Sequence, residues 1–454
     1  MRKILFTSFF IIFTMSLMSG NAVFNIKDYG AKGNGKTINT KYINDAISAC
    51  NLAGGGMVLV PKGLYITGTI IMQSNVHLYL ESGAIIKGTD NLSEYKAYIP
   101  TKDMHKYGMA YFPNWTRGLI VATKASNMSI SGSGIIDGSH VEDPKGEEGK
   151  RGPHGIVFGE CSNFQITGIS ITRASNYAFV GYENENAYFS NLTMTEGWDG
   201  IHIRGGKNVI IHDCTFYTGD DAIAGGFWNN VSISNCFINT ACNGIRVIFP
   251  ASNLEIANCT FQGPGKFPQR STFSGQRRNM LGAVVVQPGG WDYSPGHCDN
   301  INIHDLTIDS MNSAVSIFLN KGNSAGSVIV ERIKATNIVL AAYSAESWNG
   351  GYFENVIFKD ITTTFKGDAN KNLRNLRLEN TSIESRKMPY WGFYGKNIKN
   401  LTLENIDFSY TDAEVRSTFG FENIEKINMK NIKTKAVADV KRDVLIQCGN
   451  IISE

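Results

Sequence analysis

A short phrase recurs every 22 residues in the middle of the chain, and it limits the folds open to this sequence. Its copies are Tyr177-Ala178-Phe179-Val180, Asp199-Gly200-Ile201-His202, Asp221-Ala222-Ile223-Ala224 and Asn243-Gly244-Ile245-Arg246. A fixed period of this length is typical of a solenoid, in which each repeat forms one coil that stacks on its neighbours. Residues one period apart are therefore expected to lie side by side in space.

A column of asparagines follows nearly the same period. Its members are Asn163, Asn186, Asn208, Asn230 and Asn253, at intervals of 23, 22, 22 and 23 residues. Each precedes a short segment rich in apolar and β-branched residues that is too short for a helix, such as Val209-Ile210-Ile211. Asparagine tolerates the left-handed backbone of a turn and can hydrogen-bond to a stacked copy of itself. We expect later copies near Asn300, Asn355, Asn375 and Asn400, and an irregular stretch with a long loop over 264–299.

Short strands joined by tight turns predict an all-β fold, a single-domain parallel β-helix over residues 23–454. One solenoid can absorb this length, because each coil contacts only its neighbours. Before the first regular coil, 40–53 carries apolar residues at helical spacing and ends in Gly54-Gly55-Gly56. We expect a short helix there that covers the open end of the solenoid.

Residues 1–22 have the features of a signal peptide: Arg2 and Lys3, an apolar run over 4–18, and the small residues Gly20 and Ala22. The mature chain is then expected to be periplasmic or secreted, and a retained N-terminal anchor is the alternative. No later stretch reaches transmembrane length. The formal net charge is +3 without a dense basic stripe, so nothing indicates binding to nucleic acid.

The chain has eight cysteines, and three of them share a place in the repeat. Cys214, Cys236 and Cys259 each fall six residues after a repeat asparagine, which predicts a column of buried thiols. No Cys-x-x-Cys or His-rich spacing accompanies them, so metal ligation is not indicated.

The repeat brings Asp199 and Asp221 onto adjacent coils, about 4.8 Å apart if the coils stack as strands, with Asp220 beside them. A carboxyl group crowded by two others is hard to ionise, so it can keep a proton while the others accept one. Which of the three keeps the proton does not follow from the residues, since coupled groups titrate as a set.

Several motifs resemble those of one enzyme family. They are Asp28-Tyr29-Gly30-Ala31-Lys32-Gly33, the segment from Gly54 to Tyr65, Gly134-Ile135-Ile136-Asp137-Gly138, Asp199-Gly200-Ile201 and Thr218-Gly219-Asp220-Asp221. Over residues 24 to 260 the chain resembles the polygalacturonase-like enzymes of glycoside hydrolase family 28. The resemblance implies a right-handed β-helix and inverting hydrolysis of a pectic or related plant-type polysaccharide or oligosaccharide, without metal or cofactor. It further implies that Asp220 is the general acid, while Asp199 and Asp221 orient and deprotonate the attacking water.

The chain departs from this family's pattern at three places. Cys242-Asn243-Gly244 replaces Gly-His-Gly, Gly197 and Trp198 replace the Asn and Thr before the first catalytic Asp, and 282–287 lacks the charges of Arg-Ile-Lys. In the family the last motif binds the galacturonate carboxylate, so its loss favours a neutral sugar or a mixed backbone such as rhamnogalacturonan. Arg246 offers a replacement charge for a substrate carboxylate, or it pairs with the aspartates themselves.

Further candidates for substrate binding surround the acids. His202 and Arg204 alternate with Ile201 and Ile203, so they are expected to point away from the core into the cleft. Asn243 aligns with the acids and either binds water or sugar or only lowers the charge density of the column. Trp198 and Trp228 adjoin the acidic coils, and we expect them to stack on sugar rings. Other aromatic candidates, which either stack or pack loops, are Phe227, Trp291, Tyr293 and Trp348.

Two other classes of function stay open. In a calcium-dependent polysaccharide lyase on the same fold, Asp199, Asp220 and Asp221 would bind Ca²⁺ and Arg246 would abstract the proton. In a non-catalytic glycan-binding solenoid, the same surface would bind a polysaccharide without turnover. The residues do not define the sugar, the linkage, endo or exo action, or the oligomeric state.

Overall fold

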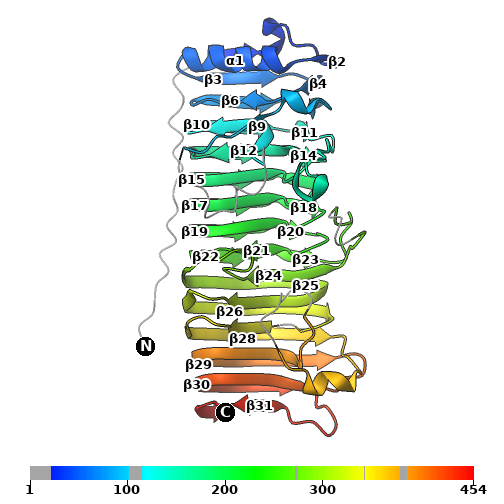
Figure 1. Cartoon of the computed structure of the whole chain (residues 1–454), viewed down its shortest axis with the longest axis vertical. Coiled ribbons are helices and arrows are strands. Elements are labelled where there is room, and N and C mark those ends of the chain that lie inside the picture. Colours follow the sequence, from blue (N-terminus) through cyan, green and yellow to red (C-terminus); the bar gives the residue numbers. More distant parts are fainter. Residues whose placement is uncertain (1–21, 102–114, 271–274, 342, 379–385, 454) are drawn as a thin grey trace.

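The chain forms one continuous stack of coils. The computed structural model describes residues 22–101, 115–270, 275–341, 343–378 and 386–453. The coils follow one another along the longest axis in sequence order, from the helix α1 at one end to β31 at the other (Figure 1). Nearly all strand pairs are parallel, and the fold is the predicted right-handed parallel β-helix. The expected signal peptide lies outside the described residues.

The strands line three faces of the stack. The first face contains β1 (Val23–Asn25), β3 (Gly56–Val60), β6 (Val76–Leu80), β10 (Ser126–Gly132), β13 (Ser162–Thr167), β22 (Ala251–Ala257), β26 (Asn323–Ile338), β28 (Phe353–Phe365) and β32 (Asn450–Ser453). The second contains β2 (Asn34–Ile38), β4 (Gly63–Thr67), β7 (Ala84–Gly88), β11 (Ile135–Asp137), β14 (Ser170–Thr172), β16 (Thr193–Glu196), β18 (Thr215–Thr218), β20 (Phe237–Ile238) and β23 (Thr260–Gln262).

The third face carries the candidate site and is called the site sheet. It contains β5 (Ile70–Ile71), β9 (Arg117–Thr123), β12 (His154–Gly159), β21 (Ile245–Val247), β24 (Met280–Val286), β27 (Tyr343–Ser347) and β31 (Asp443–Ile446). Long strands run from one face onto the next: β15 (Phe179–Ser190), β17 (Ile201–His212), β19 (Ile223–Ser234), β25 (Gly296–Leu319), β29 (Tyr390–Tyr410) and β30 (Ser417–Thr434). The strands β26 and β28 likewise continue from the first face onto the second. A short strand, β8 (Lys96–Ala97), pairs antiparallel with β9.

The asparagine column explains how these long strands bend between faces. Asn186 and Asn208 have left-handed backbone angles, with φ of 54° and 55°. Their side chains form a ladder in which Nδ2 of Asn208 donates to Oδ1 of Asn186, and Asn186 donates to Asn163, both at 2.8 Å. Both roles that the sequence predicts for the column are therefore confirmed. The sequence places the repeated phrase that ends in Ile201-His202 and the segment Val209-Ile210-Ile211 in separate units. In the structure these residues belong to one bent strand, β17.

The interior of the coils is one continuous apolar core. Cys214, Cys236 and Cys259 are buried there as free thiols, as the sequence predicts. The ladder continues from Asn253 to Asn300, whereas Asn375 ends a short 3-10 helix, η6 (Lys371–Asn375), so the prediction that it opens a strand is wrong. The described residues also form the 3-10 helices η1 (Ile26–Tyr29), η2 (Leu92–Glu94) and η5 (Glu147–Gly149).

The predicted capping helix is present as α1 (Thr40–Leu52). It buries Ile43, Ala46, Ile47 and Cys50 against the first coil, and the three glycines that follow have positive φ, which ends the helix. In the part of the chain that the structure describes, no helix has the length and apolar character needed to cross a membrane.

Candidate active site

The turns that lead into β17 and β19 bring the three predicted acids together. Ile201 pairs with Ile223, so the aspartates two residues earlier, Asp199 and Asp221, occupy equivalent places on neighbouring coils. The Gly200 amide donates to the carbonyl oxygen of Asp221 at 3.0 Å, which ties the two turns. Asp199 and Asp221 are each only 4% exposed, whereas the side chain of Asp220 is 13% exposed. Asp220 is thus the most accessible of the three acids.

Burial and mutual repulsion make this cluster hard to ionise. The pKa of Asp199 is raised well above its ordinary value by burial and then by the charges of Asp220 and Asp221. The pKa of Asp221 is raised by burial, against the lowering effect of Arg246, and further by Asp220. The carboxyl groups in this patch therefore resist ionisation, as the sequence predicts for crowded acids. The raised pKa values fall on Asp199 and Asp221, the two residues that the family resemblance makes proton acceptors.

Asn243 binds one of the acids directly. Its backbone N–H and its side-chain Nδ2 both donate to Oδ1 of Asp221, at 2.9 and 3.0 Å. The side chain is fully buried. Of the two roles expected for Asn243, water or sugar contact does not fit its burial, and the amide instead binds and orients Asp221.

His202 and Arg204 leave the apolar core as predicted, but they do not reach the surface. Both are buried. Nδ1 of His202 lies 2.6 Å from Oδ2 of Asp199, and Nε of Arg204 donates to Nε2 of His202 at 3.0 Å. The ring of Tyr177, from the preceding coil, stacks on His202 at 4.6 Å between centroids. The predicted substrate contact of both side chains is therefore corrected: His202 contacts Asp199, and Arg204 contacts His202.

Trp198 and Trp228 are not the sugar platforms that the sequence predicts. Trp228 is 2% exposed, packs in the main core and donates from Nε1 to the carbonyl oxygen of Ile203 at 2.9 Å. Trp198 is 0% exposed, and the guanidinium groups of Arg151 and Arg270 lie 5.2 and 5.0 Å from its ring. The core encloses Trp228 and loop side chains cover Trp198, so no sugar can stack on either ring.

An exposed aromatic ring nevertheless lies near the acids. Trp291 is 55% exposed, and the Arg246 guanidinium carbon is 5.7 Å from its ring centre. Nη1 of Arg246 is also 3.7 Å from Oδ2 of Asp221. Arg246 thus links an accessible ring to the acid cluster, which fits its predicted place in the column of His202.

Two of the remaining aromatic candidates, Phe227 and Trp348, contact residues other than the three aspartates. Phe227 stacks on Phe249 at 4.8 Å between ring centroids, and Trp348 donates from Nε1 to Oε2 of Glu346. Tyr293 is exposed, but no contact joins it to the acids among the described residues.

Two side chains beside Asp220 come from loops that do not belong to the repeat. Nη2 of Arg151 is 3.7 Å from Oδ2 of Asp220 and 2.8 Å from Oε1 of Glu148. Nε2 of Gln269 donates to Oδ1 of Asp220 at 3.3 Å. Sequence reasoning missed both, because no period relates loop residues to the coil that they cover. For Gln269 the one available signal was the basic character of the segment around it, with Lys266, Arg270, Arg277 and Arg278.

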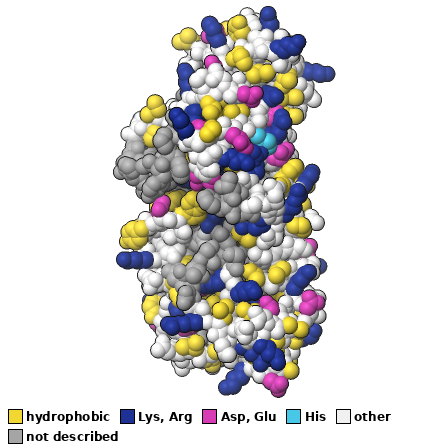
Figure 2. Space-filling model, turned by 45° about the vertical axis from the view of Figure 1, so that its right-hand side comes forward, with side chains coloured by type: hydrophobic (Ala, Val, Ile, Leu, Met, Phe, Trp, Pro, Cys, Tyr) yellow, Lys and Arg dark blue, Asp and Glu magenta, His cyan; other side chains and the backbone are white. Residues whose placement is uncertain are grey.

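A cavity of 370 Å³ opens next to this group. It is lined by Lys150, Glu196, Gly197, Phe267, Pro268, Gln269, Arg270, Gly275 and Gln276. Gln269 lines the cavity and also contacts Asp220, so the space adjoins the most accessible acid. On the face drawn in Figure 2, basic, acidic and histidine side chains gather in the upper half of the molecule.

Comparison with known proteins agrees with this architecture. Residues 23–246 match a family model described as rhamnogalacturonase A/epimerase, pectate lyase-like. Over 250 residues the chain is 26% identical to an exo-poly-α-D-galacturonosidase of Dickeya chrysanthemi, which covers 44% of this chain and 41% of that protein. Over 351 residues it is 25% identical to an exopolygalacturonase of Arabidopsis thaliana, which covers 70% of this chain and 74% of that protein. By these comparisons the chain is similar to the polygalacturonase-like family and diverges from it.

Solved structures of this fold include enzymes of more than one class. A family 28 exopolygalacturonase of Yersinia enterocolitica aligns with a TM-score of 0.57 and 17% identity, over 95% of this chain and 78% of that chain. The A-module of a mannuronan C-5 epimerase of Azotobacter vinelandii aligns with a TM-score of 0.50 and 14% identity, over 95% of this chain and 100% of that chain. At these identities the likeness concerns the fold alone.

The structure locates the departures of this polygalacturonase-like chain from the family pattern. Asn243, in place of the family histidine, binds Asp221. Val285, in the stretch that replaces Arg-Ile-Lys, pairs with Arg246 on the next coil, so the positive charge stands one coil nearer to the acids.

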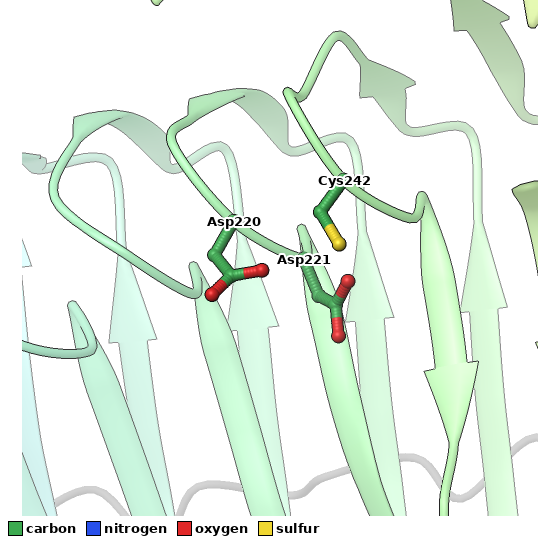
Figure 3. A group of neighbouring side chains, drawn as sticks. All are labelled: Asp220, Asp221 and Cys242. Carbon is green, nitrogen blue, oxygen red and sulfur yellow. The ribbon is translucent and has the colours of Figure 1, made fainter. Parts of the chain in front are cut away.

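The donor atoms of one group of side chains lie close enough together to hold a metal ion. Donor atoms of Asp220, Asp221 and Cys242 lie within 4.8 Å of one another (Figure 3). Calcium takes oxygen ligands, so this group with its thiol does not fit calcium and differs from the three aspartates that the lyase alternative names as ligands.

Proposed function

We propose that this polygalacturonase-like chain is a glycoside hydrolase that cleaves a pectic polysaccharide or its oligosaccharides with inversion. The observation that carries the proposal is the cluster of Asp199, Asp220 and Asp221 on adjacent coils, with one acid more accessible than the other two. Its relatives of known name, an exo-poly-α-D-galacturonosidase and an exopolygalacturonase, support a substrate of the pectic class.

The reaction assigns a different task to each acid. Asp199 accepts a proton from a water molecule that Asp221 helps to orient, and the water oxygen bonds to the anomeric carbon. The bond from that carbon to the leaving oxygen breaks, and its electron pair stays on that oxygen, which takes the proton of Asp220. The greater exposure of Asp220 and its place beside the cavity support its role as the acid that reaches the leaving group.

The charges around the cluster support an acidic sugar in the substrate. Arg246 lies between Asp221 and the exposed ring of Trp291, where its guanidinium can pair with a carboxylate while the ring contacts a sugar face. Arg270 and Lys150 line the adjoining cavity. These groups offer positive charge at a place other than the family's Arg-Ile-Lys motif. A backbone that contains uronic acid, including rhamnogalacturonan, suits this arrangement.

The cavity also has a polar feature that suits sugar hydroxyl groups. Oε1 of Gln269 is buried and accepts no hydrogen bond from any described residue. Buried polar atoms are normally satisfied, so an acceptor of this kind next to a cavity suits a hydroxyl donor of a bound sugar. The ring of Phe267 adds an apolar surface to the same space.

We further propose that the protein is exported, to the periplasm or out of the cell. The proposal rests on the basic and apolar sequence of residues 1–22 and on a polysaccharide substrate, which is an extracellular polymer. N-terminal sequencing of the mature protein tests it: a start near Val23 supports cleavage, and a start at Met1 contradicts it.

The decisive experiment is product analysis on polygalacturonan, rhamnogalacturonan and neutral polysaccharides, with and without EDTA. New reducing ends without ultraviolet absorbance, unaffected by the chelator, are expected for a metal-independent hydrolase. Proton NMR of the first products then reports whether the anomeric configuration inverts. Ultraviolet absorbance that EDTA abolishes would instead identify a calcium-dependent lyase, and saturable binding without products would identify a glycan-binding protein.

A further inference from the structure

Three buried side chains form a hydrogen-bonded chain that ends on one of the acids. Nε of Arg204 donates to Nε2 of His202 at 3.0 Å, and Nδ1 of His202 lies 2.6 Å from Oδ2 of Asp199. All three residues are at least nine-tenths buried, so water does not compete for these contacts.

The donor at one end determines which nitrogen of the imidazole carries its proton. A guanidinium group can only donate hydrogen bonds, so Nε2 of His202 must accept from Arg204. A neutral imidazole that accepts at Nε2 carries its hydrogen at Nδ1, and this N–H therefore donates to Asp199. Arg204 thus selects the tautomer of His202.

The surroundings of His202 keep the ring neutral. Burial lowers its pKa well below the usual value, and the positive charges of Arg204, Arg246 and Arg151 lower it further, together with His154. Tyr177 stacks on the ring in a nearly parallel arrangement, with 2° between the planes. The surroundings of His202 therefore keep its ring uncharged and fix its orientation.

The groups that face Asp199 act in opposite directions. Burial and the neighbouring carboxyl groups of Asp220 and Asp221 favour its protonated form, whereas Arg151 and Arg246 favour the ionised form. The charge of Asp199 also raises the pKa of the Tyr177 hydroxyl. A hydrogen bond from Nδ1 of His202 also favours the ionised form of Asp199, because such a bond is stronger to a carboxylate than to a carboxylic acid.

We propose that His202 is a positioning residue, whose Nδ1–H, directed by Arg204, orients Asp199 to accept the proton of the attacking water and opposes the effects that favour the protonated form of this acid. This inference rests on the proposed function, because it needs Asp199 to act as the base. His202 itself touches neither substrate nor water in this scheme and acts through the carboxylate.

The test compares two substitutions at one position. His202→Asn keeps an N–H near the place of Nδ1, whereas His202→Leu removes the donor. His202→Leu should lower kcat by about 10- to 100-fold through loss of a charge-assisted hydrogen bond. It should also move the acidic limb of the kcat/KM profile to higher pH by about 1 to 2 units, because Asp199 then ionises less readily. His202→Asn should restore most of kcat and the original limb.

The chain offers a matched control on the same strand. Nδ1 of His212 lies 2.6 Å from Oδ2 of Asp213 at the other end of β17, far along the strand from the acids. His212→Leu removes a similar His–Asp pair and should leave kcat and the pH profile unchanged. Circular dichroism of all variants reports whether each one is folded.

A spectroscopic measurement tests the tautomer without any turnover. In ¹⁵N spectra of the imidazoles, the signal that disappears in His202→Asn should show a protonated Nδ1 and an unprotonated Nε2, and Arg204→Leu should abolish that preference. A protonated Nε2 in the wild type, or an unmoved acidic limb in folded, active His202→Leu, would overturn the inference alone. A wild type that hydrolyses no glycan would overturn the proposed function, and the role of His202 with it.

Discussion

Substitution of Asn243 by Ala should destabilise the protein to an extent that depends on pH. The side chain of Asn243 donates to the buried carboxylate of Asp221 at 3.0 Å, and the backbone N–H of residue 243 keeps its own bond to the same oxygen. Loss of one hydrogen bond to a buried charged group costs about 1.5–3 kcal/mol, against about 0.5–1.5 kcal/mol for a neutral pair. The free energy of unfolding should fall by about 2 kcal/mol at neutral pH, and by less in mild acid.

The sign follows from the pKa of Asp221. Burial raises the pKa of Asp221 in the folded state. Asp221 therefore stabilises the folded state at pH values below its ordinary pKa, and this contribution is lost as the pH rises through the folded-state pKa. Asn243→Ala removes a group that lowers this pKa, so the pKa rises further and the loss of stability grows with pH. In acid, where Asp221 is protonated in both proteins, only the smaller neutral bond is lost.

Urea unfolding followed by circular dichroism, at neutral pH and in mild acid, measures this difference. Asn239→Ala is the matched control, because Nδ2 of Asn239 donates to the neutral carbonyl oxygens of Gln262 and Pro264 one coil away. Its loss of stability should be the same at both pH values. If Asn243→Ala shows an equally flat loss, or a larger loss in acid, the reasoning about Asp221 is refuted.

Three further predictions concern activity. Asp220→Asn should remove nearly all turnover while the circular dichroism spectrum stays that of the wild type, and wild-type rates in this variant would refute the assignment of the acid. Arg246→Ala should raise KM for acidic substrates more than for neutral ones, and equal effects on both classes would leave Arg246 only its ion pair with Asp221. Trp291→Ala should raise KM about 2- to 10-fold through loss of a stacking contact of about 0.5–1.5 kcal/mol, and an unchanged KM would exclude this ring from substrate binding.

The acid cluster could be predicted from the sequence because a solenoid turns a fixed period into a fixed neighbour. Asp199 and Asp221 share a place in the repeat, so their closeness needs no knowledge of any loop. The same logic predicted the asparagine ladder and the buried cysteine column.

Exposure could not be predicted in this way. Trp198 and His202 leave the apolar core, as their places in the repeat require, but loops and neighbouring side chains cover them. The side chains of Arg151 and Gln269 reach Asp220 from segments without a period, and their positions depend on the path of each loop. The place of a residue in the repeat predicts whether its side chain points into or away from the core. Whether that side chain is buried depends on the loops and side chains that cover it.

The constant length of the coils has a consequence for insertions and deletions. Loss of a single residue between Asn208 and Asp221 would shift the following strand by one place, so side chains that face the core would turn outward and the acids would separate. A change in the length of the chain between β23 and β24 would leave the register of these strands unchanged. Lineages of this protein can therefore change the walls of the cavity by insertion and deletion, while the aspartates tolerate only changes that preserve the count.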